Sequence, residues 1–331
     1  MVIKMKGNSM NVEKIDVAVQ SYKKPESLIY TLLTLKKFCG KHIDTIYIQD
    51  DCSGPETIKV YQDSAFLEAI DPINIKLHIN TKNCGICYFS VDSLNKLHNR
   101  IMYHLYRLRG INPNIVDSED LRYQYALDNT DKKYVLLIHD DVQFTGDIVA
   151  KYLNSLTSNT AIIGDLGQCW RCPLSNRCCP AEIASHRLPS NSRWPITYCC
   201  DTLKDFRRFK FEKRACRINE WCCLINVKIA KELAKDSIYF GAYEDLGDIG
   251  AYWFDEIVHR GYSFDDPLAP NSPLTGETDL GSNKSMYYIH CWQGFSGHSV
   301  WQDQGNGKNA YPIDMINKRL KDEYGLTLGS H

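Results

Sequence analysis

Short runs of β-branched and other apolar residues alternate with helical patterns through the first half of this chain. We predict strands over residues 15–20, 45–49, 73–79 and 133–138. Helices are predicted from Pro25, from Glu56 and over residues 94–108, where leucine and isoleucine recur at helical spacing. Strands that alternate with helices predict an α/β fold with a mostly parallel sheet flanked by helices.

Polar residues stand at the carboxyl ends of three predicted strands. Ser21 follows the first strand, Asp50 and Asp51 follow the second, and Asp140 and Asp141 follow the fourth. Because the carboxyl ends of parallel strands meet at one edge of a sheet, we expect these side chains to share a ligand-binding crevice. Grouped carboxylates repel one another unless a cation, a proton or hydrogen-bond donors lie between them. The alternative is that each acidic pair caps the helix or turn that follows it.

Taken in order along the chain, these residues resemble the motifs of the GT-A glycosyltransferases, in particular the large inverting family that uses nucleotide-sugar donors (glycosyltransferase family 2). The similarity extends over roughly residues 14–300. It departs from the family at Cys52, where glycine is usual, and at His139, where an acidic residue is usual. The matching segments are Ser21-Tyr22-Lys23-Lys24-Pro25-Glu26, Asp50-Asp51-Cys52-Ser53, Asn83-Cys84-Gly85, His139-Asp140-Asp141, Gly241-Ala242-Tyr243-Glu244-Asp245 and residues 290–296.

The resemblance implies a GT-A (Rossmann-like) fold in a single domain and a metal-dependent, inverting glycosyltransferase. Such an enzyme moves a sugar from a nucleotide-sugar donor, most often UDP-linked in this family, to a hydroxyl of a glycan or glycolipid acceptor. The bond that breaks leaves a diphosphate, and a hard cation such as Mn²⁺ or Mg²⁺, held by carboxylates, neutralises its charge.

Metal and donor ligands follow from the same resemblance. Asp141 is the implied main metal ligand, and Asp140 contacts the metal or the ribose. His290 is the implied last ligand of the metal or the diphosphate, with His298 as its competitor. His139 either shifts the metal preference toward softer ions or faces the core.

The implied donor pocket lies at the ends of the first two strands. Asp51 holds the base or the ribose, and Ser21 and Asp50 line the same pocket. Lys24 lies near the diphosphate, unless it is an ordinary exposed lysine.

Transfer with inversion needs a base that takes the proton from the acceptor hydroxyl. By the resemblance this base is Asp245. Glu244 is a rival, because the family's next acid often comes two residues after the aspartate, whereas Asp248 comes three after it. An aspartate before the apolar pattern of residues 246–257 is also typical of an ordinary helix cap.

The chain contains 14 cysteines, and ten of them come after residue 168. Six of these form a group that could hold a structural zinc ion in a cysteine-rich insertion, because the first two have the spacing of a zinc knuckle. The alternative is that they are reduced, partly buried thiols. Cys222 and Cys223 lie in an apolar run that predicts a core strand. The six are Cys169, Cys172, Cys178, Cys179, Cys199 and Cys200.

The net charge and the apolar runs limit which classes of partner and which cellular compartment we expect. A formal net charge of −1 argues against a nucleic-acid partner, which would require a basic excess. Residues 1–15 hold no apolar run of the length of a secretory signal, and no stretch reaches the ~18 consecutive apolar residues of a membrane span. We therefore expect a soluble, cytoplasmic, reduced protein.

A basic stretch over residues 204–214, interleaved with phenylalanines, could contact a membrane surface or an anionic, lipid-linked acceptor. The alternative is a solvated loop or helix face. Peripheral attachment to a membrane is thus one expectation for this segment.

The expected organisation has four parts: an N-terminal extension (1–13), a nucleotide-sugar-binding half (14–150), an acceptor half with the cysteine-rich insertion (151–265), and a C-terminal loop and tail (266–331). Two other functions stay open. One is a zinc-stabilised, catalytically inactive binding protein of the same fold, which the substitutions at His139 and Cys52 would suit. The other is a retaining GT-A transferase.

Overall fold

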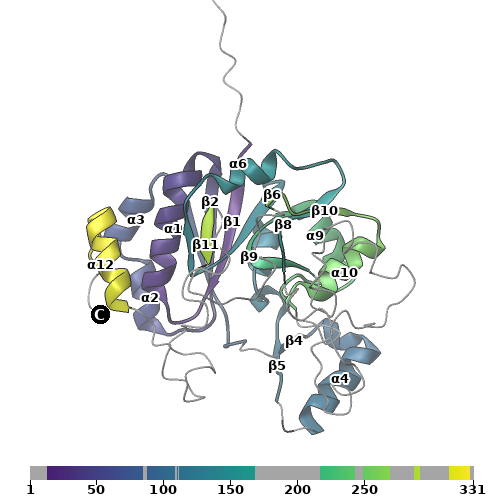
Figure 1. Ribbon diagram of the computed structural model, residues 1–331. Helices are drawn as coiled ribbons and strands as arrows, with labels where there is room; N and C mark the ends of the chain where they lie inside the picture. Colours follow the sequence, from purple (N-terminus) through teal and green to yellow (C-terminus); the bar gives the residue numbers. More distant parts are fainter. Residues whose placement is uncertain are drawn as a thin grey trace, which may run out of the picture.

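A seven-stranded sheet forms the centre of the molecule (Figure 1). The computed structural model describes residues 13–84, 88–108, 110, 112–167, 217–242, 249–268, 287–290 and 313–328. The strand order is β10-β8-β9-β6-β1-β2-β3. The strands are β1 (Ile15–Ser21), β2 (Ile43–Asp50), β3 (Asn74–Ile79), β6 (Tyr134–His139), β8 (Thr160–Gly167), β9 (Arg217–Asn226) and β10 (Ser263–Asp265).

Most neighbouring strands of this sheet run parallel, and β9 is antiparallel to both β6 and β8. The mostly parallel α/β sheet that we predicted is therefore confirmed. Residues 14–150 contribute β1, β2, β3 and β6, and residues 151–265 contribute β8, β9 and β10. Both halves thus belong to one continuous sheet.

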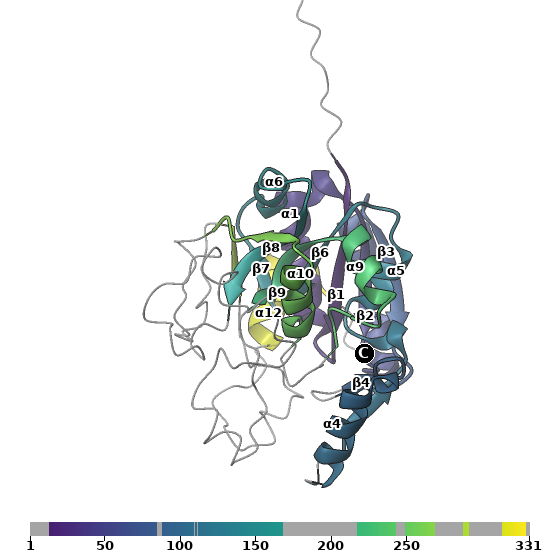
Figure 2. The same ribbon diagram turned by 90° about the vertical axis from the view of Figure 1, so that its right-hand side faces the viewer.

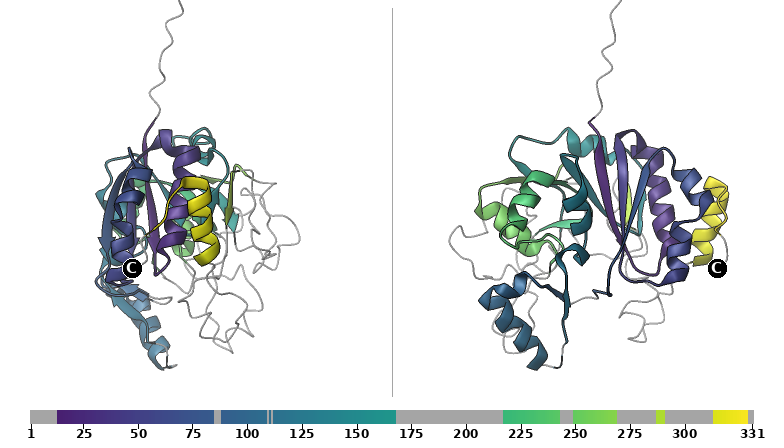
Figure 3. Two further views of the ribbon diagram at one scale, coloured as in Figure 1. Left: turned by 90° about the vertical axis from the view of Figure 1, so that its left-hand side faces the viewer. Right: turned by 180° about the vertical axis from the view of Figure 1, so that it is seen from behind.

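Helices cover both faces of the sheet (Figures 1 and 3). Adjacent residues of β1 show why: Val17 and Val19 pack into one hydrophobic core, and Ala18 packs into the other. The first core includes helices α1 (Pro25–Cys39), α2 (Pro55–Tyr61), α3 (Ser64–Ile70), α6 (Ile148–Leu153) and α12 (Ile313–Tyr324). The second includes α5 (Gln124–Asn129), α9 (Val227–Ala234) and α10 (Ala251–His259).

Two small sheets lie beside the main one. β7 (Val142–Phe144) pairs antiparallel with β11 (Tyr288–His290), and β4 (Tyr88–Ser90) pairs parallel with β5 (Asn114–Val116). Helix α4 (Leu97–Leu108) lies between β4 and β5 in the sequence and extends away from the main sheet (Figure 2). Among the described helices, none is long and apolar enough to cross a bilayer.

The chain changes direction across the sheet between β1 and β6. From β1 it proceeds through β2 to β3 on one side, and it then returns to form β6 on the other side of β1. In open α/β sheets such a switch point leaves a crevice beyond the carboxyl ends of the two strands, where ligands bind. Ser21 is the last residue of β1 and His139 is the last residue of β6. Asp140 and Asp141 follow His139 directly.

Candidate active site

The polar residues at the strand ends are brought together by the sheet register. In the β1–β2 pair, Ser21 stands opposite Asp50, and in the β1–β6 pair Gln20 stands opposite His139. Residues 21, 50 and 140 therefore meet at one edge of the sheet, as we predicted from their positions in the sequence. All three are buried.

Asp140 is held by residues of β1 and α1. Its Oδ2 accepts a hydrogen bond from Ser21 Oγ at 2.8 Å, and its Oδ1 lies 2.7 Å from Lys24 Nζ. Its backbone carbonyl accepts a further bond from Ser27 Oγ at 2.6 Å. Both carboxylate oxygens thus have partners inside the protein, and the metal or ribose contact of Asp140 stays a prediction.

Lys24 is largely covered at this edge, so the exposed lysine that we kept as an alternative is wrong. Its side chain is only 12% exposed. Burial lowers the pKa of Lys24, but the charges of Asp140 and Asp141 outweigh it and raise that pKa above its ordinary value. Lys24 is therefore a fixed positive charge where the resemblance expects the donor diphosphate.

His139 lies between two carboxylates at the end of β6. Its Nδ1 is 3.8 Å from Asp141 Oδ1, and its Nε2 is 3.7 Å from Glu220 Oε1 on β9. Burial raises the pKa of Glu220, but Arg217, with Nη2 at 3.3 Å, and His139 together hold it well below its usual range. The imidazole therefore faces the site beside Asp141 as well as the antiparallel strand.

The β7–β11 pair places His290 next to the acidic motif. His290 stands opposite Val142, the residue directly after Asp141. Asp141 and His290, both of which we predicted as metal ligands, lie about 150 positions apart in the sequence. The antiparallel strand pair thus brings their backbones close together. Within the described residues no group of three or more histidine, cysteine, aspartate or glutamate side chains surrounds a metal position.

This ligand set fits Mn²⁺ or Mg²⁺ held jointly by the protein and a substrate. Such ions keep several waters and are bound through one or two carboxylates plus substrate phosphates, in place of a complete protein cage. Asp141, beside the fixed charge of Lys24, has the chemistry for this kind of site. We therefore retain Asp141 as the residue that would hold the metal.

Asp50, the last residue of β2, accepts hydrogen bonds from the loop and the helix that follow the strand. Its Oδ1 accepts a hydrogen bond from the backbone N–H of Ser53 at 2.7 Å, and its Oδ2 accepts one from Tyr61 Oη at 3.3 Å. Burial raises the pKa of Asp50 more than these bonds lower it, and the neighbouring Asp51 raises it further. Asp50 therefore organises the loop after β2, which is part of the role that a capping aspartate would have.

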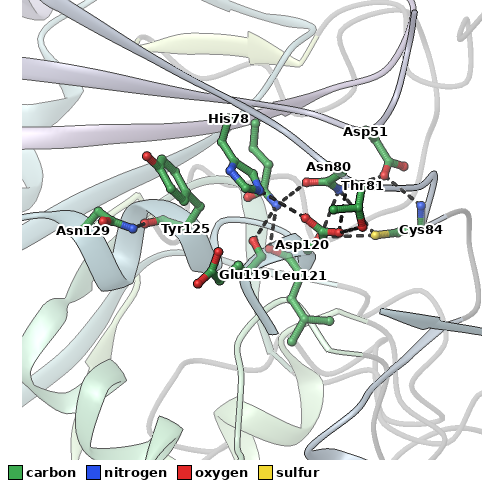
Figure 4. Close-up of polar contacts among 11 residues, drawn as sticks. Asp51, His78, Asn80, Thr81, Cys84, Glu119, Asp120, Leu121, Tyr125 and Asn129 are labelled. Carbon is green, nitrogen blue, oxygen red and sulfur yellow. Dashed lines mark hydrogen bonds and ion pairs between the residues drawn. The ribbon is translucent and has the colours of Figure 1, made fainter. Parts of the chain in front are cut away.

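Asp51 is oriented by the turn that we matched to the family's asparagine-glycine motif (Figure 4). Asn80 Nδ2 and the Cys84 backbone N–H donate to Asp51 Oδ1 at 3.0 and 2.8 Å, and Asn83 Nδ2 donates to Oδ2 at 3.1 Å. A carboxylate offers about four acceptor positions, so three donors leave capacity for about one more. A ribose hydroxyl or a base N–H is a donor of that kind.

Asp120 belongs to this network, and we did not predict it. His78 Nε2 and the Thr81 backbone N–H lie 3.1 and 3.0 Å from its carboxylate, and Asn80 Nδ2 donates to its carbonyl oxygen at 3.0 Å (Figure 4). The His78 ring also stacks on Tyr125, with centroids 4.2 Å apart. Asp120 thus fixes the loop after β3 that in turn fixes Asp51.

Arg122 is a second cation near the strand ends that sequence reasoning missed. The carbonyl of Leu121, directly before it, accepts a hydrogen bond from Gln49 Nε2 of β2 at 3.0 Å, and the charge of Arg122 lowers the pKa of Lys24. A Cβ atom added to Gly241 would lie 2.2 Å from the Arg122 carbonyl oxygen, so the glycine of the predicted glutamate-aspartate motif packs directly on this residue. The motif's start is therefore next to the donor edge of the sheet.

Several predicted site residues lie outside the described residues. They are the candidate bases Asp245 and Glu244, the cysteines from Cys169 to Cys200, the basic stretch 204–214, and His298. These stay predictions. Cys222 and Cys223, in contrast, are described and fully buried in β9, which confirms them as core residues. They are free thiols, as are Cys39, Cys52 and Cys84.

No protein-family model matches the chain, and no curated protein matches it by sequence. Among solved structures it is similar to a mannosyltransferase from Pyrobaculum calidifontis in complex with GDP-Man and Mn²⁺, at 13% identity and a TM-score of 0.42, over 77% of this chain and 54% of that one. It is also similar to TarS of S. aureus (residues 1–349), at 12% identity and a TM-score of 0.41, over 93% and 66% of the two chains.

A third similar structure is 4-diphosphocytidyl-2C-methyl-D-erythritol synthase from Anaerococcus prevotii, at 12% identity and a TM-score of 0.39, over 77% of this chain and 89% of that one. The chain spans about half the length of the mannosyltransferase structure. Likenesses at these TM-scores and identities say nothing about activity. The arrangement itself is GT-A-like: a mostly parallel sheet flanked by helices, with the matched motifs of the first half at its carboxyl edge. Function has to be inferred from those residues.

Proposed function

We propose that this chain is a glycosyltransferase that uses a nucleotide-sugar donor and a divalent cation, and that transfers the sugar with inversion to a hydroxyl of a glycan or lipid-linked acceptor. The observation that carries the proposal is the convergence of Ser21, Asp50 and Asp140 at the β1–β6 switch point, with His290 beside the end of the same motif.

Each charged group at this edge has a part in binding the donor. Asp141, with His290, would hold Mn²⁺ or Mg²⁺, which when bound neutralises the charge of the leaving diphosphate. Lys24 and Arg122 add fixed positive charge to the same edge. Asp51, whose orientation is set by Asn80, accepts a hydrogen bond from the base or the ribose.

The acceptor side completes the reaction. Asp245, or Glu244, takes the proton from the attacking hydroxyl as the new glycosidic bond forms and the bond to the diphosphate breaks. Gly241 anchors the start of this motif against Arg122. UDP is the nucleotide that we expect, because the resembled family uses it most.

Calorimetric titration tests this proposal with UDP and GDP, each with and without Mn²⁺. We expect metal-dependent binding of one nucleotide by the wild type and its loss in Asp141→Ala. Asp245→Asn should bind as the wild type does but should not transfer sugar. Asp131→Ala is a matched control, because Asp131 is an exposed aspartate before the amino end of β6, at the opposite edge of the sheet from Asp140.

Three outcomes bear against the proposal. Absence of binding under every condition would favour the inactive binding protein. Normal transfer by Asp141→Ala would remove the metal role of that residue. Retention of the anomeric configuration in the product, measured by NMR, would replace inversion by the retaining reaction.

A further inference from the structure

Helix α4 presents a stripe of exposed apolar side chains. Leu97, Ile101 and Leu108 are 66%, 51% and 84% exposed, and Val91, shortly before the helix, is 50% exposed. At about 100° per residue, Leu97, Ile101 and Leu108 fall within about 40° of one another on the helix. Four of the eight exposed large apolar side chains found among the described residues thus lie between positions 91 and 108.

The opposite face of α4 is already packed. Tyr103 and Tyr106 make edge contacts with Phe89 of β4, with ring centroids 6.0 and 6.2 Å apart. Asn99 is fully buried and donates to the Ser93 carbonyl at 3.0 Å. The exposed stripe is therefore a second apolar face, because the first already packs against the protein.

The base of α4 is fixed to the rest of the molecule. Lys96 Nζ donates to the Ser237 carbonyl at 2.9 Å and lies 5.5 Å from the centre of the Tyr252 ring. Tyr239 Oη donates to Asp92 Oδ2 at 3.0 Å. The helix thus projects at a defined place, beyond β4 and β5 and away from the main sheet (Figures 1 and 2).

The charge over residues 93–116, which begin directly after Asp92, has one sign. Residues 93–116 contain four lysines and arginines and neither aspartate nor glutamate, whereas the whole chain has a net charge of −1. Arg100, His104 and Arg107 are exposed and lie along one side of the apolar stripe. An amphipathic helix with an apolar face and basic residues beside it is the kind that lies in the plane of an anionic membrane surface.

We propose that α4 docks on an anionic lipid surface, with Leu97, Ile101 and Leu108 among the acyl chains and Arg100 and Arg107 against the headgroup phosphates. A second copy of the chain is a poorer occupant, since a twofold contact through this face would bring like charges together without an acid on the segment to pair them. The proposal is independent of the 204–214 segment and of the donor chemistry.

Docking of this kind also places the candidate site near the lipid. Asn114 of β5 donates through Nδ2 to the carbonyls of Asn83 and Cys84, each at 3.0 Å. Those two residues are the ones that hold Asp51. Strand β5, which follows α4, is therefore hydrogen-bonded to the loop that holds Asp51 at the donor edge of the sheet. This proximity suits an acceptor embedded in a membrane.

Flotation of the full-length protein with vesicles tests the proposal. We expect it to float with vesicles of phosphatidylcholine mixed with phosphatidylglycerol and to stay behind with phosphatidylcholine alone. Arg100→Gln with Arg107→Gln should weaken the anionic binding about 30-fold, and Ile101→Gln with Leu108→Gln at least about tenfold. Since all four side chains are exposed, these variants should unfold at the wild-type temperature.

Leu67→Gln with Met315→Gln is the matched control, because both side chains are exposed, at 40% and 41%, on α3 and α12. It should float as the wild type does. Equal flotation with neutral vesicles, no flotation at all, or wild-type flotation of both α4 variants would each overturn the proposal. So would a dimer, seen by light scattering without lipid, that the α4 substitutions dissociate.

The outcome is separable from that of the proposed activity. Asp141→Ala should float with anionic vesicles as the wild type does, and the α4 variants should bind nucleotide as the wild type does. Loss of nucleotide binding in every protein, with flotation intact, would reject the glycosyltransferase and leave the lipid contact standing.

Discussion

Lys24 Nζ lies 2.7 Å from Asp140 Oδ1, and the two side chains are 12% and 8% exposed. The lysine comes from the turn before α1 and the aspartate from the end of β6, on the two sides of the switch point. The pair therefore ties the two strands together at the place where the ligand is expected. Lys24 is paired with one carboxylate oxygen of Asp140, and Ser21 Oγ donates a hydrogen bond to the other.

We expect Lys24→Met to lower the free energy of unfolding by about 3 kcal/mol, because it leaves Asp140 buried without its cation. Adding Asp140→Asn should recover part of this loss, since the uncompensated charge is then gone. Urea unfolding of the two single variants and the double variant measures the coupling. Lys59→Met, at the exposed ion pair with Glu56, serves as control and should change little.

The pH dependence of this pair has a definite sign. The folded-state pKa of Lys24 is raised above the ordinary 10.5. The stabilisation is therefore fully present below that value and is lost only as the pH rises through the folded pKa. In the urea experiment at neutral pH, the coupling would be contradicted if the effects of Lys24→Met and Asp140→Asn on the free energy of unfolding simply added in the double variant.

Asp50→Asn should stabilise the protein at neutral pH, because burial raises the pKa of Asp50 above its ordinary 3.8. A raised carboxyl pKa means that the folded state binds the proton more tightly, so ionisation of Asp50 costs stability as the pH rises above that range. The asparagine can still accept from the Ser53 N–H. Thermal unfolding should show an advantage at pH 7 that disappears as the pH falls toward 4.

Asp128→Asn provides a comparison for this experiment, since burial also raises the pKa of Asp128, away from the strand ends. Both variants should show the same sign of pH dependence, and only Asp50→Asn should weaken nucleotide binding. A variant at position 50 that is less stable at pH 7 than at acidic pH, relative to the wild type, would contradict the assignment.

The meeting of Ser21, Asp50 and Asp140 could be predicted from the sequence because it depends only on strand direction. Parallel strands place their carboxyl ends at one edge whatever their exact order. The partners of each carboxylate could not be predicted in the same way. Lys24 has the pattern of an exposed lysine, and only the crossing of the chain between β1 and β6 brings it against Asp140.

Strand β9 and residue Asp120 show a second limit. The apolar run at residues 221–227 predicts a core strand, but a run of buried residues carries no mark of direction, and β9 is antiparallel. Asp120 is the last residue of a short 3₁₀ helix (Ser118–Asp120) between β5 and α5, and its partners His78 and Thr81 come from the end of β3. An aspartate two residues before an arginine, in a segment without helical or strand pattern, was the signal that could have pointed to it.

Cys52→Gly should raise the free energy of unfolding by about 0.5–1 kcal/mol. Cys52 has φ of 63°, in the left-handed region, where a side chain is strained and glycine is not. This backbone conformation explains why the resembled family has glycine at the position. Cys52→Ala keeps the strain and removes the thiol, so it should show no such gain; equal stabilisation by both variants would assign the effect to the thiol. Chemical denaturation of the wild type, Cys52→Gly and Cys52→Ala measures the three free energies of unfolding.

Gly241→Ala should lower the free energy of unfolding by about 1–3 kcal/mol and weaken nucleotide binding. The added Cβ would lie 2.2 Å from the carbonyl oxygen and 2.8 Å from the nitrogen of Arg122, so one backbone segment must move. The charge of Arg122 lowers the pKa of Lys24, so a shift of Arg122 would change the positive charge at the proposed diphosphate site. Gly40→Ala is the matched control, because its Cβ would meet only the Lys36 and Ile73 side chains, the nearest at 3.4 Å. Thermal unfolding and calorimetry with nucleotide and Mn²⁺ measure both effects, and wild-type values in both would show that this contact does not couple the acidic motif to the donor edge.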